Sequence, residues 1–189
     1  MRPPDDSILR FPGGNVGVIL CGGESRRMGR DKGLLQTDGR AWALRMGDKL
    51  SPWIKHVVYS INKSQFTAYS ALIPENQLVV DTDEREGPMN GLFSVWQKYF
   101  RCSFLLLACD MQDVDKSTLQ KLIAAAQIGS ADCYAFEIDG TLQPFCAIYR
   151  AEAFLKAGST SPSLRALLNS VTTERLQGDP AAFQNYNSL

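Results

Sequence analysis

Short, largely apolar runs of three to six residues recur along the chain, and each has the length of a buried strand. They cover residues 16–20, 57–61, 78–80, 104–108, 133–138 and 145–149. Runs that lack strict alternation of polar and apolar residues are typical of a sheet covered on both faces. The pattern therefore predicts a sheet in the interior of the molecule.

Apolar residues at helical spacing mark the segments between these runs. Trp42, Met46 and Leu50 lie on one helical stripe, and Pro52 helps to end that helix. Similar stripes predict a helix after Gly87-Pro88, one with Asp115 as its N-cap, and helices over 151–156 and 163–168. Alternating strands and helices predict an α/β fold: a three-layer, Rossmann-like, mainly parallel but mixed sheet flanked by helices.

Length and composition agree with one enzyme domain. The 189 residues suit a single α/β domain with a substantial core. Lys plus Arg and Asp plus Glu are equal at 20 each, so no overall charge attracts nucleic acid or an anionic membrane. The N-terminal stretch lacks a basic-then-apolar signal, and the longest apolar run is too short to span lipid. Five cysteines without a Cys-x-x-Cys pair argue against a disulfide framework. We expect a cytoplasmic protein.

The first apolar run leads into the most informative segment of the chain. Gly22 and Gly23 follow the run directly, and Arg26, Arg27 and Lys32 come shortly after. Paired glycines let backbone N–H groups approach a ligand, and consecutive amides in such a turn can bind an anion. Three nearby cations strengthen that tendency. The segment therefore predicts a polyphosphate site.

Spacing excludes two well-known phosphate loops. A Walker loop requires Gly, four residues and then Gly-Lys-Ser/Thr, whereas five residues separate Gly23 from Gly29 here and Gly33 follows Lys32. The Gly-x-Gly-x-x-Gly pattern of dinucleotide-binding proteins is also absent. That absence argues against a dinucleotide-dependent oxidoreductase.

Two carboxylates follow apolar runs in the same way as the glycines. Asp81 comes after the run 78–80, and Asp110 closely follows the run 104–108. Because ligands of parallel sheets bind beyond the carboxyl ends of the strands, we expect Gly22, Asp81 and Asp110 to face one crevice. Mg²⁺ needs only one or two carboxylates when phosphate oxygens and water complete its shell. Asp110 is therefore the predicted magnesium ligand.

The residues of this segment resemble a known family. Residues 22–32 read Gly-Gly-x-Ser-x-Arg-Met-Gly-x-Asp-Lys, which is similar to the signature of molybdenum cofactor guanylyltransferase, the MobA family of the nucleotidyltransferases. Cys109-Asp110 resembles the pair that holds magnesium in the family, although Met111-Gln112 stands where the family has a small residue and proline. The resemblance implies a fold like that of nucleotide-diphospho-sugar transferases. It also implies a single domain over residues 1–189. Its first half, about residues 15–115, would bind the nucleotide, and its second half, about residues 116–189, would bind the acceptor.

The resemblance also assigns the candidate site residues. Lys32, Arg26 and Asp110 would be catalytic. The expected nucleotide and acceptor contacts are Leu20, Cys21, Gly22, Gly23, Ser25, Arg27, Gly29, Lys32, Asn62, Asp81, Gly87, Gly91, Asn185 and Asn187. The two C-terminal asparagines would contact the pterin or its phosphate.

The implied reaction is magnesium-dependent transfer of GMP from GTP to the phosphate of molybdopterin or Mo-molybdopterin, with release of pyrophosphate. In it, Arg26 would bind the β- and γ-phosphates, and Lys32 would bridge the α-phosphate and the acceptor. Such a reaction depends on positioning and electrostatics rather than on a strong base. Partners would be these two substrates and proteins that deliver the cofactor.

Alternatives remain open at this point. One is a nucleotidyltransferase with another base or acceptor, such as molybdopterin cytidylyltransferase or a sugar-phosphate enzyme; the Asp31-Lys32 pair counts against it. Another is a nucleotide-binding regulatory protein without turnover, against which Lys32 and Asp110 argue.

Overall fold

The computed structural model describes residues 11, 13–22, 31–82, 87–157 and 161–184. In these residues, seven strands form one sheet in the order β5-β4-β1-β6-β8-β7-β9. Their bounds are β1 Asn15–Leu20, β4 Val57–Ile61, β5 Leu78–Val80, β6 Ser103–Ala108, β7 Cys133–Ile138, β8 Thr141–Tyr149 and β9 Thr173–Gln177. Strands β1, β4, β5 and β6 are mutually parallel, while β8 is antiparallel to both β6 and β7. The prediction of a mainly parallel, mixed sheet is confirmed.

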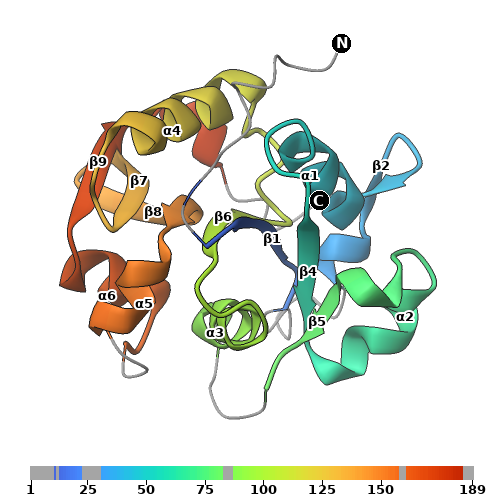
Figure 1. The fold of residues 1–189 in the computed structure, drawn as a ribbon. Coiled ribbons are helices and arrows are strands. Elements are labelled where there is room, and N and C mark those ends of the chain that lie inside the picture. The colour runs from blue at the N-terminus through green and yellow to red at the C-terminus, as the bar shows by residue number, and fades with distance from the viewer. Residues whose placement is uncertain (1–10, 12, 23–30, 83–86, 158–160, 185–189) are drawn as a thin grey trace.

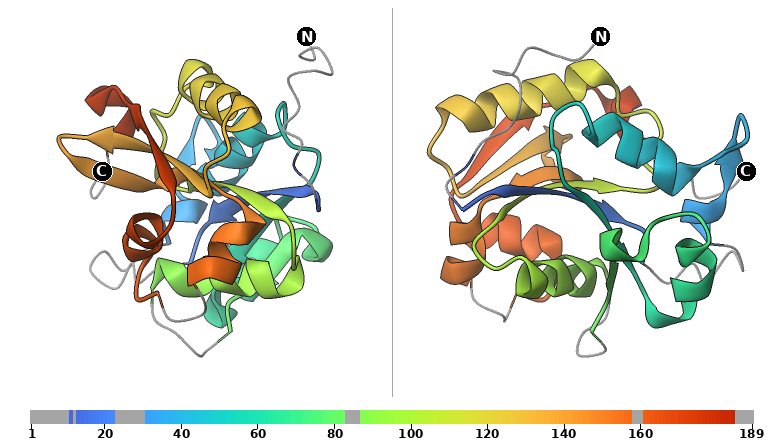
Figure 2. Two further views of the ribbon diagram at one scale, coloured as in Figure 1. Left: turned by 60° about the vertical axis from the view of Figure 1, so that its left-hand side comes forward. Right: turned by 45° about the vertical axis from the view of Figure 1, so that its right-hand side comes forward.

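Helices cover both faces of this sheet, as Figures 1 and 2 show. One face carries α1 (Trp42–Leu50) and α4 (Lys116–Ile128); the other carries α3 (Pro88–Lys98), α5 (Ala151–Ala157) and α6 (Leu164–Ser170). Helix α2 (Phe66–Ser70) lies beside the edge strand β5. Each face has its own buried cluster: Met46, Tyr69 and Leu122 belong to the first, and Leu92 and Leu167 to the second. The predicted three layers are therefore present.

Several short elements complete the fold. A small hairpin joins β2 (Gln36–Thr37) and β3 (Arg40–Ala41), and single helical turns form η3 (Lys32–Leu34), η4 (Lys63–Gln65), η5 (Glu75–Gln77) and η7 (Pro180–Phe183). No helix of the described ranges is long and apolar enough to cross a lipid bilayer.

The sequence pattern missed some of these elements. Strand β8 begins at Thr141, four residues before the predicted run, because its first part pairs with β7 in a hairpin that extends past the rest of the sheet. Strand β9 was not predicted at all. Its sequence, Thr-Glu-Arg-Leu-Gln, is polar because the strand lies at the edge of the sheet and is largely exposed.

Candidate nucleotide and metal site

The ends of the parallel strands bring the predicted site residues to one edge of the sheet. Strands β1 and β6 are neighbours in register, with Leu20 opposite Ala108, so Gly22 and Asp110 leave the sheet side by side. Asp81 follows β5 two strands away, and its backbone N–H donates to the carbonyl of Ile61. The three strand ends therefore lie at one edge of the sheet.

Lys32 and Asp110 form the charged centre of this edge. The Nζ of Lys32 lies 2.9 Å from Oδ2 of Asp110, although 78 residues separate them in the chain. Both side chains are 19% exposed, so they remain accessible from solvent. The short turn η3 presents Lys32 because Asp31 caps it, accepting a hydrogen bond from the backbone N–H of Gly33 at 3.0 Å. A cation and a metal-competent carboxylate therefore meet at a single point.

The turn that carries Asp110 is held from two sides. Nζ of Lys49, in α1, donates to the carbonyls of Gln112 and Val114 at 2.5 and 2.8 Å. The side-chain amide of Gln112 donates to the carbonyl of Cys109 at 2.7 Å. Burial lowers the pKa of Lys49, since desolvation disfavours its charge. These contacts hold the turn at Met111-Gln112, where the resembled family has a small residue and proline.

Asp81 occupies a tight place beside the first glycine turn. Its Oδ1 accepts a hydrogen bond from Oγ of Ser60 at 2.8 Å. A β-carbon at position 22 would lie 2.7 Å from its Oδ2, and one at position 91 would collide with Oγ of Ser60. Burial raises the pKa of Asp81 to about 6, and the hydrogen bond from Ser60 opposes that rise. Glycine is thus required at position 22 by the close approach of this carboxylate and at position 91 by that of the Ser60 hydroxyl.

The chain beyond Asp81 is tied to helix α3. The backbone N–H of Thr82 donates to Oγ of Ser94 at 2.9 Å, and the side-chain amide of Asn90 donates to the Thr82 carbonyl. Gly87 caps this helix with φ of +76°, a conformation that favours glycine, and Pro88 follows at its first position. Gly87 therefore shapes the turn at the helix start.

Other predicted residues have identified positions. Leu20 is buried in the core, and the buried thiol of Cys21 faces the carbonyl of Ile19 at 3.7 Å, with a pKa raised by burial. The side-chain oxygen of Asn62 caps η4 by accepting from the backbone N–H of Gln65 at 3.1 Å. Seven predicted residues lie outside the described part of the chain: Gly23, Ser25, Arg26, Arg27, Gly29, Asn185 and Asn187.

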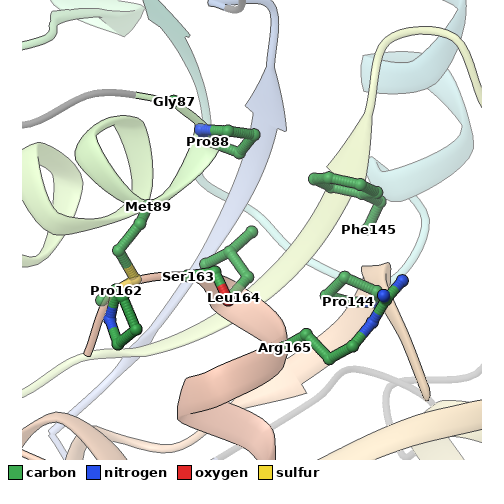
Figure 3. Close-up of a pocket in the computed structure, with 9 residues that line it drawn as sticks. All are labelled: Gly87, Pro88, Met89, Pro144, Phe145, Pro162, Ser163, Leu164 and Arg165. Carbon is green, nitrogen blue, oxygen red and sulfur yellow. The ribbon is translucent and has the colours of Figure 1, made fainter. Parts of the chain in front are cut away.

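A pocket of about 490 Å³ lies between the start of α3, strand β8 and the start of α6. Figure 3 shows the side chains that line it. They are Gly87, Pro88, Met89, Pro144, Phe145, Pro162, Ser163, Leu164 and Arg165. The lining is apolar apart from Ser163 and Arg165. Gly87 belongs both to this pocket and to the predicted nucleotide contacts.

The carboxylates fit a magnesium ion that shares its shell with a substrate. Among the described residues, no group of three or more His, Cys, Asp or Glu side chains could hold a metal alone. Mg²⁺ typically keeps several waters and takes one or two carboxylates plus phosphate oxygens. Asp110 could supply one such carboxylate, with phosphate oxygens and water completing the shell.

Sequence reasoning missed three residues that organise the site. Ser60, Lys49 and Gln65 all contact groups far from them in the chain. The one sequence feature that could have indicated a role for Ser60 is its hydroxyl inside an otherwise apolar run. Gln65 follows Asn62 by three residues, which is a capping-box spacing.

A mainly parallel α/β sheet with a glycine, a lysine and single carboxylates beyond its strand ends is typical of proteins that bind phosphorylated ligands such as nucleotides. Comparison with known proteins identifies the family. Residues 17–177 match the family model of the MobA-like NTP transferase domain, and the chain belongs to this family of nucleotidyltransferases.

Curated relatives agree with this assignment, and a solved structure shares the fold. The chain is 33% identical to molybdenum cofactor guanylyltransferase of Xanthomonas euvesicatoria pv. vesicatoria, over 92% of this chain and 89% of that protein. It is also 33% identical to a molybdenum cofactor biosynthesis bifunctional protein of Synechocystis, over 70% of this chain but only 38% of that longer protein. Molybdopterin-guanine dinucleotide biosynthesis protein A of Archaeoglobus fulgidus shares the fold, with a TM-score of 0.72, 19% identity and 92% of each chain covered.

Proposed function

We propose that the chain transfers GMP from GTP to the terminal phosphate of molybdopterin or Mo-molybdopterin and releases pyrophosphate. The contact between Lys32 and Asp110 carries the proposal, because it joins a phosphate-binding cation to a magnesium-competent carboxylate at the carboxyl edge of the sheet. The names of the relatives, molybdenum cofactor guanylyltransferase among them, support the choice of base and acceptor.

The triphosphate would bind along the segment after β1. Backbone amides of Gly23 and Gly29 would donate to phosphate oxygens, and Arg26 would pair with the β- and γ-phosphates, assisted by Arg27. The backbone N–H of Gly22 donates to the carbonyl of Ser60 at 3.0 Å, so Gly22 would contribute by lacking a β-carbon. Ser25 and the backbone of Leu20 and Cys21 would border the nucleotide. Asn62, Asp81, Gly87 and Gly91 would contact the base or ribose.

Asp110 would hold Mg²⁺ together with phosphate oxygens of GTP. The metal would supply charge neutralisation of the phosphates and orientation for in-line displacement. Lys32 would keep its position beside Asp110 and contact the α-phosphate, where negative charge increases in the transition state. Its ammonium also lowers the repulsion between two anionic substrates.

The proposed chemistry needs no covalent intermediate on the protein. An oxygen of the acceptor phosphate attacks the α-phosphorus of GTP and forms a new P–O bond. The bond from the α-phosphorus to the bridging oxygen breaks, and pyrophosphate leaves with that oxygen and its electron pair. The acceptor phosphate is already ionised at neutral pH, so positioning and charge stabilisation provide most of the rate enhancement.

The acceptor would occupy the pocket beside Gly87. Its apolar lining, with Phe145 and Leu164, suits a flat heterocycle, and Arg165 supplies a cation for a phosphate. Asn185 and Asn187 would complete the contacts to the pterin or its phosphate. The pocket belongs to the segments β8 and α6 of the predicted acceptor half, with α3 on its other side.

Release of pyrophosphate tests the proposal directly. The protein is incubated with molybdopterin, Mg²⁺ and each of GTP, CTP, ATP and UTP, and pyrophosphate and the dinucleotide product are measured. We expect turnover with GTP that depends on both molybdopterin and Mg²⁺. A preference for CTP would assign a different base, release with sugar phosphates would assign a different acceptor, and tight binding without turnover would indicate a regulatory protein.

A further inference from the structure

Asp31, the residue directly before Lys32, is bound from three directions. Its Oδ1 accepts hydrogen bonds from the backbone N–H of Gly33 at 3.0 Å and from the hydroxyl of Tyr69 at 2.9 Å. Its Oδ2 accepts from the side-chain amide of Gln65 at 2.6 Å. A carboxylate satisfied in this way serves as an anchor for the chain, and it has little remaining need for a substrate or metal.

Gln65 joins three separate segments of the site through one side chain. Besides Asp31, its amide group donates to the carbonyl of Cys21, at the end of β1, at 3.2 Å. Its carbonyl oxygen accepts from the backbone N–H of Asn62, at the end of β4, at 2.8 Å. The end of β1, the turn η3 that carries Lys32 (the lysine turn) and the end of β4 are thus connected through position 65.

Tyr69 supplies the rigid part of this arrangement. It is fully buried in the core cluster that also contains Met46 and Leu122. Burial strongly raises the pKa of its hydroxyl, and Asp31 adds to the effect, so the group stays protonated and can only donate toward that carboxylate. A β-carbon at position 33 would collide with this hydroxyl, which explains glycine directly after Lys32.

The position of Lys32 depends on these contacts. Lys32 is next to Asp31 in the chain and lies in a helical turn of only three residues, whose N-cap is Asp31 itself. A turn this short has few internal hydrogen bonds, so its orientation depends on what holds its ends. Misplacing a reacting group by about 1 Å can cost about 100-fold in rate.

We infer that Gln65 and Tyr69 are positioning residues that aim Lys32, through Asp31, at the phosphate to be transferred. The inference rests on the proposed function, since it assigns a task to the lysine of that reaction. Neither side chain is among the residues proposed to contact substrate. Their effect on turnover therefore exists only while Lys32 is present.

A double-mutant cycle tests that dependence. Gln65→Leu removes the hydrogen bonds to Cys21, Asp31 and Asn62 at similar size, and Tyr69→Phe removes only the hydroxyl. We expect each to lower kcat by about three- to tenfold, the effect of a lost hydrogen bond, with little change in KM for the acceptor. In the Lys32→Ala background, the same substitutions should lower kcat less than twofold.

Tyr59→Phe is the matched control for the loss of a buried hydroxyl. Tyr59 is another buried tyrosine of the same core cluster, but its hydroxyl faces Gly47 in α1 rather than the lysine turn. We expect its kcat to equal that of the unmodified chain. Gln65→Glu is a second probe: it keeps the acceptor for Asn62 but places a second carboxylate against Asp31, so it should lower kcat at least as much as Gln65→Leu.

Additive losses in the cycle would overturn the inference, because a purely structural role lowers activity equally with and without Lys32. Unchanged kcat in both Gln65→Leu and Tyr69→Phe would overturn it as well. Titration of GTP binding in all variants separates this result from failure of the proposed function. If the unmodified chain binds GTP but never releases pyrophosphate, the proposed function fails, and a cycle in GTP affinity still decides whether positions 65 and 69 act through Lys32.

Discussion

In the proposed reaction Lys32 binds phosphate and Asp110 binds Mg²⁺, and the contact between their side chains brings these two roles to one point. The ion pair is partly exposed, with each side chain 19% accessible. Exposed and half-exposed pairs contribute about 0–1 kcal/mol to stability. Substitution of either residue should therefore affect turnover much more than folding.

Lys32→Ala is the substitution that isolates the charge. We expect it to keep the unfolding temperature within the range of ordinary surface variants but to lose about 2–4 kcal/mol of transition-state stabilisation, or roughly 30- to 1000-fold in kcat/KM. Pyrophosphate release with GTP measures the loss. Lys55→Ala, at an exposed position away from the site, is the control and should be fully active. Unchanged turnover in Lys32→Ala would remove the assigned role.

Asp81 makes stability depend on pH in a defined direction. Its pKa rises from 3.8 in the unfolded chain to about 6 in the folded one because the carboxylate is buried. Between these two pKa values the folded state binds more protons than the unfolded state. The resulting contribution to the unfolding free energy is fully present below pH 3.8 and is lost as the pH rises through 6. The loss between pH 4.5 and 7.5 amounts to about 2 kcal/mol.

Asp81→Asn removes this titration and keeps an oxygen for Ser60. Urea unfolding at pH 4.5 and 7.5 measures both chains. We expect the stability of the unmodified chain relative to the variant to fall by about 2 kcal/mol between these pH values. An equal pH dependence in both chains would show that Asp81 has an ordinary pKa.

The sequence pattern indicates candidate site residues but not the distant residues that hold them in place. Gly22, Asp81 and Asp110 are singled out by the apolar runs that they follow, and Lys32 by the segment Gly-Gly-x-Ser-x-Arg-Met-Gly-x-Asp-Lys that it ends. The partners that hold them could not be predicted: the bond from Gln65 to Asp31 spans 34 residues and the bond from Lys49 to Gln112 spans 63. Only the folded sheet brings such pairs together, and no local spacing encodes them.

At the scale of elements, helix α1 supports the turn that follows β6. Lys49 is the last-turn lysine of α1, and it donates to the carbonyls of Gln112 and Val114. The side-chain oxygen of Gln112 is buried and has no hydrogen-bond partner among the described residues, so this turn depends on its other hydrogen bonds. Helix α1 thus holds this turn through Lys49, at the place where the resembled family has a proline.

Lys49→Met should loosen that turn while preserving the packing of the lysine stem. We expect a loss of about 1–3 kcal/mol in unfolding free energy, since two carbonyls lose a charged donor. The Mg²⁺ concentration needed for half-maximal activity should rise, because Asp110 is less well placed. Lys116→Met, at an exposed position at the start of α4, is the matched control. An unchanged Mg²⁺ requirement would show that the turn holds Asp110 without Lys49.

Elements with strong apolar patterns were predictable, and polar ones were not. The core strands β1, β4 and β6 and the helices α1 and α4 follow directly from hydrophobic periodicity. Strand β9 was missed because an edge strand buries little and has no apolar signature. Helix α2 was missed because it has only five residues, although its buried Tyr69 is central to the lysine turn.

At the scale of the whole molecule, one sheet edge combines both halves of the proposed reaction. Segments from β1, β5 and β6 carry the nucleotide candidates, and segments from β8 and α6 line the adjoining pocket. Gly87 is shared between them. Direct transfer would require the donor phosphate and the acceptor phosphate to meet beside Lys32.

Binding of nucleotide should therefore stabilise the whole molecule only when metal is present. A ligand at 100 times its Kd adds about 2.7 kcal/mol to the unfolding free energy, or about 5–10 °C in Tm for a domain of this size. We expect such a shift for GTP with Mg²⁺, and a much smaller one for GTP with EDTA, since Asp110 then repels the phosphates. In Asp110→Asn the Mg²⁺ dependence should disappear, whereas Asp113→Asn, exposed in the same turn, should retain it. Equal shifts with and without Mg²⁺ would contradict the metal site, because triphosphate binding would then need no cation at Asp110.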